Sequence, residues 1–281
     1  MGQGDSQLPL VYLLLLLLKI YINFLAKQQN SNRPFCTDWR QYNIHGGSIY
    51  LSRELELPED SGYLKVPVED IYSATNNLNE SNCIGEGTAG RVYKGILFDN
   101  QNVAVKHIIK DGCMETFLRE VRSLTHVRHP NLVALLGYGT NDEERFLIYE
   151  LCPNGNLAQW LFGMDTALSW IKRLEIAIDS ARGLQFLHTY PEGSIIHRDI
   201  KAKTISTREG STFGFVDPRL HGEYSVEAFE ATFALALACT APTQQRPCIK
   251  EVVTKLEEAL AISMKAKASS PQSTPQQSTL F

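Results

Sequence analysis

The hydrophobic residues between positions 83 and 151 follow the short periods that are typical of β-strands, with one helical interruption. Two β-rich runs, "CIGEGTAGRVYKGIL" and "NVAVKHII", are joined by the turn-like "FDNQ", and "RFLIYEL" predicts a further strand. Between these strands, "ETFLREVRSLTHV" places Phe117, Val121 and Leu124 on one face of a helix. This part of the chain therefore predicts a small sheet with one helix.

The hydrophobic period changes to that of α-helices in the second half of the chain. "LSWIKRLEIAIDSARGLQFLHTY" predicts a long helix that begins after Ser169 as its N-cap and ends before Pro191. Its buried stripe comprises Trp170, Leu174, Ala177, Ile178, Ala181, Leu184 and Leu187. "SVEAFEATFALALACT" and "RPCIKEVVTKLEEALAI" predict two more helices, with Pro247 in the first turn of the second. Strands followed by helices predict the α+β class, with a sheet-rich N-lobe and a helical C-lobe.

The N-terminal segment "LPLVYLLLLLLKIYINFLA", residues 8–26, is strongly apolar and approaches the roughly 20 residues of a membrane-spanning helix. Lys27, Arg33 and Arg40 follow it, and no Lys or Arg precedes it, which favours a cytosolic C-terminal side. We therefore expect a membrane-associated protein. A cleaved signal peptide, a buried segment of a cytoplasmic protein and myristoylation of Gly2 in "MGQGDS" are the alternatives.

Composition along the chain predicts the following division: an anchor at 1–27, a juxtamembrane linker at 28–63, an N-lobe at 64–150, a C-lobe at 151–262 and a disordered tail at 263–281. The formal net charge of −4 gives no reason to expect a nucleic acid partner. The six cysteines include no C-x-x-C pair. We therefore expect free thiols rather than a zinc site or a disulfide framework.

A glycine-rich pattern, G-x-G-x-x-G-x-V, occurs in "GEGTAGRV" through Gly85, Gly87, Gly90 and Val92. Glycines at these positions let the backbone approach phosphate groups closely. A dinucleotide-binding fold would continue with a helix, whereas here the strand "VYKGIL" follows. Lys106 then ends the strand in "VAVK", a pattern in which the lysine contacts the α- and β-phosphates of ATP.

Two charged motifs extend this interpretation. Glu120 lies in "FLREV" on the predicted helix and is the expected ion-pair partner of Lys106. Solvation at the surface, beside Arg119 and Arg122, is the alternative for this glutamate. "HRDIK", residues 197–201, follows the long helix, and an aspartate in such a loop, here Asp199, accepts the proton of the substrate hydroxyl.

Taken together, the motifs resemble those of plant receptor-like and receptor-like cytoplasmic serine/threonine protein kinases. The resemblance extends over residues 64–262 in family order, and it is carried by "VEDIYSATNNLNESNCIGEGTAGRVYKG", "HVRHPNLVALLGYG", "FLIYELCPNGNL", "ARGLQFLHTYPEGSIIHRDIK" and "ACTAPTQQRPCIKEVV". It implies a two-lobed protein-kinase-like fold, ATP as ligand, and protein partners in receptor-kinase signalling.

The same resemblance implies roles for individual residues. Tyr149 would be the gatekeeper, and Glu150 to Cys152 would be the hinge that hydrogen-bonds adenine. Val92 and Ala104 would pack against the base. The remaining nucleotide contacts would come from Ile84, Gly85, Glu86, Gly87, Gly90 and Lys106, and the catalytic residues would be Asp199, Lys201, Lys106 and Glu120.

The sequence departs from the family pattern where the metal ion is held. Thr204 stands at the position of the catalytic-loop Asn, and the chain contains no D-F-G. Both usual protein ligands of Mg²⁺ are therefore missing, and Asp217 is the candidate carboxylate nearby. We expect weak ATP binding, loss of the Mg²⁺ site and impaired catalysis.

A second departure concerns "VDP", residues 216–218, which resembles both the end of an activation segment and the stretch before the last two helices. In the family these two stretches are separate. If a single "VDP" stands for both, the residues that normally lie between them are absent, which predicts a truncated C-lobe. Arg219 stands where the family has the glutamate that pairs with Arg246, so we expect Arg246 to reach solvent or shift its neighbours. Three interpretations stay open: an active kinase, a pseudokinase scaffold with or without bound nucleotide, and a truncated product of altered splicing or a faulty gene model.

Overall fold

The computed structural model describes residues 64–87, 90–97, 100–109, 114–124, 126–157, 159–163, 167–195 and 216–269. These residues form two compact units. The sheet unit contains the described residues up to Asn156 and those from Gly183 to 195, and the helical unit contains the others. No described helix is long and apolar enough to cross a membrane, and the predicted anchor at 8–26 lies outside the described residues.

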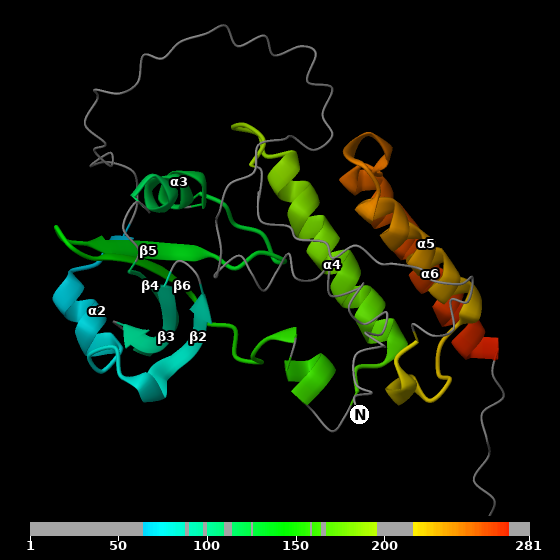
Figure 1. The fold of residues 1–281 in the computed structure, drawn as a ribbon, viewed down its shortest axis with the longest axis horizontal. Helices are drawn as coiled ribbons and strands as arrows, with labels where there is room; N and C mark the ends of the chain where they lie inside the picture. Colours follow the sequence, from blue (N-terminus) through cyan, green and yellow to red (C-terminus); the bar gives the residue numbers. More distant parts are fainter. Residues whose placement is uncertain are drawn as a thin grey trace, which may run out of the picture. The chain divides into compact units, whose positions relative to one another are not determined.

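The sheet unit is built on six strands in the order β1-β5-β6-β4-β3-β2 (Figure 1). The strands are β1 (Leu64–Lys65), β2 (Cys83–Gly87), β3 (Gly90–Leu97), β4 (Gln101–Ile108), β5 (Leu135–Thr140) and β6 (Arg145–Glu150). Strands β2 to β6 pair antiparallel, and the short β1 pairs parallel to β5. The predicted strands are confirmed. The additional strand β5, "LLGYGT", escapes the sequence pattern because its two glycines interrupt the β-forming residues.

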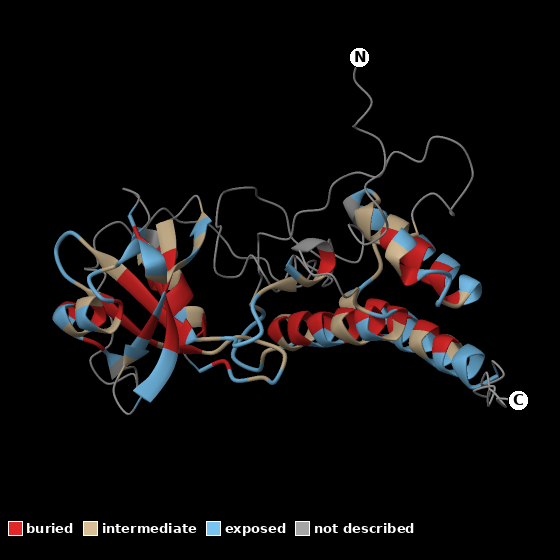
Figure 2. Ribbon diagram, turned by 90° about the horizontal axis from the view of Figure 1, so that it is seen from below, coloured by how far each residue is buried: buried red, intermediate tan, exposed pale blue. Residues whose placement is uncertain are grey.

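A helix covers each face of this sheet. Helix α2 (Val68–Ala74) packs against β3 and β5, and α3 (Met114–Leu124) packs against β5 and β6 on the other face. Because successive strand residues point to opposite faces, residues 146–149 of β6 are all buried between the two helices (Figure 2). The predicted inner face of α3, with Phe117, Val121 and Leu124, is confirmed.

The helical unit has its own hydrophobic core. Its long helices are α4 (Trp170–His188), whose first part to Arg182 belongs to this unit, α5 (Val226–Thr240) and α6 (Ile249–Ser269). Among the described residues, short helical turns occur at η5 (Gln159–Gly163), η7 (Pro218–Leu220) and η8 (Thr243–Gln245) in this unit and at η3 (Glu80–Asn82) in the sheet unit. The Ser169 hydroxyl accepts the backbone N–H of Lys172 at 3.3 Å, which confirms the predicted N-cap of α4.

Two expectations for the end of the chain are wrong. Pro247 precedes α6 instead of lying in its first turn, since the first helical bond runs from Val252 N to the Cys248 carbonyl at 3.0 Å. The disordered tail does not begin at residue 263, because α6 runs on to Ser269 and the Ser263 hydroxyl accepts the Trp170 indole N–H at 2.9 Å. Arg246 is only half-buried, so it reaches solvent as expected, and its Nε donates to the Ala241 carbonyl at 2.5 Å.

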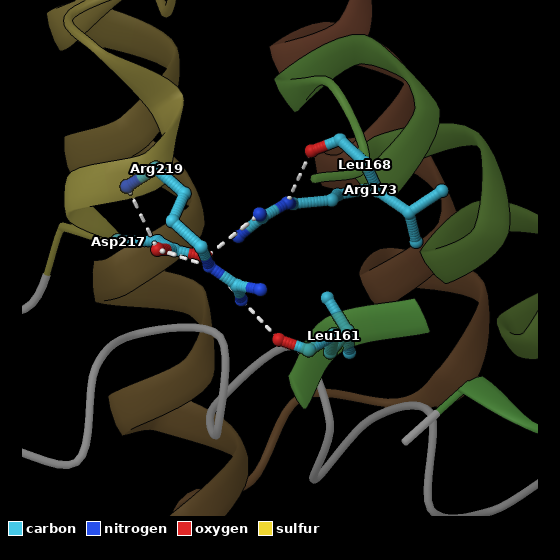
Figure 3. Close-up of polar contacts among 5 residues, drawn as sticks. All are labelled: Leu161, Leu168, Arg173, Asp217 and Arg219. Carbon is cyan, nitrogen blue, oxygen red and sulfur yellow. Dashed lines mark hydrogen bonds and ion pairs between the residues drawn. The ribbon is translucent and has the colours of Figure 1, made fainter. Parts of the chain in front are cut away.

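A buried carboxylate, Asp217, ties the segment before α5 to the start of α4 (Figure 3). Its Oδ2 accepts Nη2 of Arg173 at 2.8 Å and Nη2 of Arg219 at 3.0 Å, and its Oδ1 accepts the backbone N–H of Arg219 at 3.0 Å. The two arginines extend the cluster to backbone carbonyls, Arg173 to Leu168 and Arg219 to Leu161. Asp217 therefore holds three segments of the helical unit together.

The cluster also fixes the position of "VDP", residues 216–218, in the helical unit. Asp217 begins the turn η7 as its N-cap and is bonded to α4, so residues 216–218 lead directly into the α5–α6 pair. Burial alone would raise the pKa of Asp217, but the hydrogen bonds from Arg219 and Arg173 outweigh burial and hold it below the usual value. The carboxylate is therefore ionised and fully engaged by cations at neutral pH.

We expect Arg173→Met to destabilise the chain by about 3 kcal/mol, because it removes one partner of a buried ion pair. Arg182→Met is the matched control, since Arg182 lies on the same helix and pairs with Glu257 while half exposed. That variant should lose about 0–1 kcal/mol. Urea unfolding followed by tryptophan fluorescence measures both free energies.

The same cluster predicts a dependence on pH. Because the folded pKa of Asp217 is lowered, its stabilisation is present above the unfolded value near 4 and is lost as pH falls through the folded value. Arg173→Met should therefore weaken this acid dependence. Equal effects of the Arg173 and Arg182 variants on stability would contradict the role assigned to Asp217.

Candidate functional site

Several residues predicted to contact nucleotide are direct cross-strand neighbours in the sheet. Gly85 is paired with Val92, Val92 with Lys106, and Ala104 with Tyr149. Val92, Ala104 and Tyr149 belong to the hydrophobic cluster on the α3 side of the sheet. The strand register therefore places the apolar positions of the candidate site beside its lysine, on one face of the sheet unit.

Lys106 forms the ion pair that the sequence predicts. Its Nζ lies 3.0 Å from Oε1 and 3.1 Å from Oε2 of Glu120, and both side chains are only 4% exposed. Glu120 faces inward because it lies on the side of α3 that also buries Phe117 and Val121. The alternative of a solvated surface glutamate is therefore excluded, whereas the catalytic role of the pair stays a prediction.

A third residue, Tyr149, completes this buried group. Its hydroxyl donates to Oε1 of Glu120, the same oxygen that lies nearest to Lys106. Burial, together with the charge of Glu120 and this hydrogen bond, raises the pKa of Tyr149 well above its usual value. The hydroxyl therefore remains a donor throughout the physiological range. The sequence does not predict this bond, because Tyr149 lies on a strand and Glu120 lies on a helix far from it along the chain.

The glycine-rich strand β2 pairs with β3 around two residues that lie outside the described chain, 88 and 89. Gly90 has a φ of +151°, and a Cβ there would lie 1.8 Å from the His107 carbonyl oxygen, so only glycine fits. Ile84 is 47% exposed next to the irregular register between Cys83 and Gly85. Glu86 also reaches solvent, where it lies 3.7 Å from Arg91.

The predicted hinge follows directly after β6. The backbone N–H of Glu150 donates to the Ala134 carbonyl at 3.1 Å, and its side-chain Oε1 accepts the Ala134 N–H at 2.9 Å. Glu150 and Cys152 are both exposed as residues, but partial burial of the Cys152 thiol, together with the charge of Glu150, raises its pKa. Cys152 is one of four described cysteines, all of them free thiols as predicted.

The remaining predicted site residues belong to the catalytic loop. Asp199, Lys201 and Thr204 lie outside the described residues, so their roles stay predictions. No group of three or more metal-binding side chains occurs among the described residues. Asp217, the nearby carboxylate in sequence, has its oxygens bonded to Arg173 and Arg219. Binding a metal ion there would require breaking these bonds.

The arrangement offers a fixed ammonium group beside an apolar surface. Lys106 is held at one position by two carboxylate oxygens, and the apolar residues Val92 and Ala104 lie near the glycine-rich strand. A cation suits phosphate oxygens, and the apolar residues suit a planar base. The sheet unit therefore presents chemistry that matches a nucleoside phosphate.

We expect Lys106→Met to destabilise the sheet unit by about 3 kcal/mol, because Glu120 would remain buried without its cation. Adding Glu120→Gln should recover most of this loss, since the amide is neutral and can still accept the Tyr149 hydroxyl. Lys94→Met, at an exposed lysine on the neighbouring strand, should change stability by no more than about 0.5 kcal/mol. Urea unfolding of the four proteins measures these differences, and a double variant no more stable than Lys106→Met would contradict the explanation.

Comparison with known proteins agrees with this geometry. Residues 78–226 match the family described as "Protein tyrosine and serine/threonine kinase". The chain is 40% identical over 181 residues to the Arabidopsis thaliana "Receptor-like kinase TMK4", covering 60% of this chain and 20% of that protein. It is 42% identical over 163 residues to "Probable serine/threonine-protein kinase PBL22" from the same plant, covering 56% and 43%. The chain thus spans less than half the length of these relatives.

Proposed function

Because this chain belongs to the plant receptor-like and receptor-like cytoplasmic serine/threonine protein kinase family, we propose that its sheet unit binds ATP while its capacity for phosphoryl transfer is impaired. In this proposal the chain acts as a nucleotide-binding pseudokinase that serves protein partners. The observation that carries the proposal is the formed Lys106–Glu120 pair, with Tyr149 bonded to the same carboxylate.

The α+β kinase fold supports the ATP site, since the glycine-rich strand, the lysine and its glutamate occur together in one unit. In kinases this Lys–Glu pair must be in place for the phosphates of ATP to be positioned. Here the pair forms within the sheet unit itself, and both partners are buried. ATP binding is therefore expected without any contribution from Asp199 or Lys201.

The impairment of catalysis rests on the metal ligands. The family implies Mg²⁺ together with ATP, and catalysis of phosphoryl transfer consists largely of positioning and of charge neutralisation by that ion. Thr204 offers no carboxamide ligand, and no D-F-G aspartate occurs in the sequence. Asp217 does not fit the role either, because Arg173 and Arg219 engage both of its oxygens. We therefore infer that the chain lacks the donor set that Mg²⁺ requires in this family.

We expect a small thermal shift with ATP that is similar with Mg²⁺ or with a chelator. A ligand at 100 times its Kd stabilises a folded protein by about 2.7 kcal/mol, so even weak binding is measurable. The shift should disappear in Lys106→Met and in Lys106→Met/Glu120→Gln, and the double variant controls for lost stability. Absence of any shift in the wild-type chain would reject ATP binding.

The same preparation tests catalysis. Transfer of labelled phosphate to the chain or to a basic protein substrate should not exceed that of an Asp199→Asn control. A large Mg²⁺-dependent shift with Asp199-dependent transfer would instead establish an active kinase and would reject the pseudokinase proposal.

A further inference from the structure

Residues 66–82 lie across the face of the sheet opposite Lys106 and then continue directly into the glycine-rich strand β2. We propose that this segment, here called the brace, positions β2, so that the affinity of the site for nucleotide depends on whether α2 is docked on the sheet. The proposal rests on the ATP site proposed above, and it assigns a positioning role to residues outside that site.

The brace is docked by a buried apolar contact and a polar one. Ile71 is fully buried, and a Cβ on Gly139 of β5 would lie 2.3 Å from its Cδ1 and 3.0 Å from the Val66 carbonyl oxygen. Close approach of α2 to β5 therefore requires glycine at position 139. At the next residue, the Tyr72 hydroxyl donates to Oε1 of Glu144 at 2.6 Å. α2 thus has one defined position on the sheet.

Two strands of the sheet connect this contact to the candidate site. Val103 and Val105 of β4 face the brace, whereas Ala104 and Lys106 of the same strand face the α3 side. On β3, a Cβ on Gly95 would lie 3.0 Å from the Ala74 carbonyl oxygen, so the end of α2 also touches this strand closely. Undocking α2 would expose one side of the strand that carries the lysine.

One side chain, that of Asn82, bonds the end of α2 to the residue immediately before β2. Nδ2 of Asn82 donates to the Thr75 carbonyl at 3.0 Å, and Asn82 is the residue immediately before β2. Thr75 is itself fully buried at the end of α2, where its hydroxyl donates to the Ile71 carbonyl at 2.8 Å. The residue immediately before the glycine-rich strand is therefore bonded to the end of the docked helix and not only joined to it by the chain.

The backbone between these residues has an uncommon conformation. Asn76, Asn77 and Leu78 have φ values of 54°, 54° and 52°, in the left-handed region that L-residues rarely adopt. Such a conformation persists only where surrounding contacts enforce it. Here the contacts are the bonds to Thr75 and the burial of α2. Undocking α2 would release the turn, and the position of β2 would change with it.

A salt bridge extends the brace along the glycine-rich strand. Nη1 of Arg91 on β3 lies 2.9 Å from Oε2 of Glu80 in η3, and its Nη2 lies 3.7 Å from Oε2 of Glu86 on β2. These groups are largely exposed, so the bridge adds little stability. It does couple the brace to β2 across β3.

The test is amide hydrogen exchange of the full-length chain without nucleotide, combined with ATP titration. Gly139→Ala acts as a wedge under Ile71 and Val66, far along the chain from β2. Asn82→Ala removes the link to Thr75. Asn79→Ala is the matched control, because the Asn79 side chain bonds only to Ser81 in the described structure, within the same turn.

We expect both Gly139→Ala and Asn82→Ala, but not Asn79→Ala, to speed exchange of residues 84–87 by about fivefold, the effect of one lost hydrogen bond. ATP affinity should fall by about three- to tenfold in the same two variants. Faster exchange confined to residues 66–75 would overturn the proposal. So would unchanged ATP affinity despite faster exchange of β2.

If Gly139→Ala loosens the whole sheet, Asn82→Ala decides: faster β2 exchange than in Asn79→Ala supports the brace, and equal exchange rejects it. A wild-type chain that does not bind ATP would reject the proposed function. Exchange of residues 84–87 would still decide whether the brace positions β2.

Discussion

The carboxylate of Glu120 is buried in the sheet unit, and the surrounding structure has to compensate its charge. Lys106 supplies the opposite charge from β4, and Tyr149 supplies a hydroxyl donor from β6. Because α3 carries Glu120, these bonds fix the helix against two strands at one rotation. The positions of α3, of the Lys106 side chain and of the Tyr149 side chain therefore depend on one another. This interdependence keeps the candidate nucleotide site formed within a single unit.

The helical unit depends on a comparable buried group with a different consequence. Asp217 is held by Arg173 and Arg219, so it stabilises the packing of α4 against the segment before α5. A carboxylate used in this way is not free to bind a metal ion. The two buried carboxylates thus have different roles in the proposal. Glu120 orients a cation that suits phosphate, whereas Asp217 stabilises the fold of the helical unit.

Sequence patterns predict those features that are local along the chain. The strands β2, β3, β4 and β6, the inner face of α3 and the Ser169 cap follow from short periods, and the Lys106–Glu120 pair follows from motif order. Contacts between distant segments are harder to predict. The Tyr149–Glu120 bond, the Asp217 cluster and the docking of α2 each join residues whose proximity depends on the sheet register or on helix packing.

The central claim is that Glu120 is a buried acceptor shared by Lys106 and Tyr149. The most direct test is NMR of the chain with ¹³Cζ-labelled tyrosine, in which Tyr149→Phe assigns the Tyr149 signal and the pH is raised through the ionisation range of tyrosine. We predict that the Tyr149 signal does not move near pH 10, where exposed tyrosines ionise, because burial and the charge of Glu120 raise its pKa well above that value. Titration of Tyr149 together with the exposed tyrosines would contradict the account.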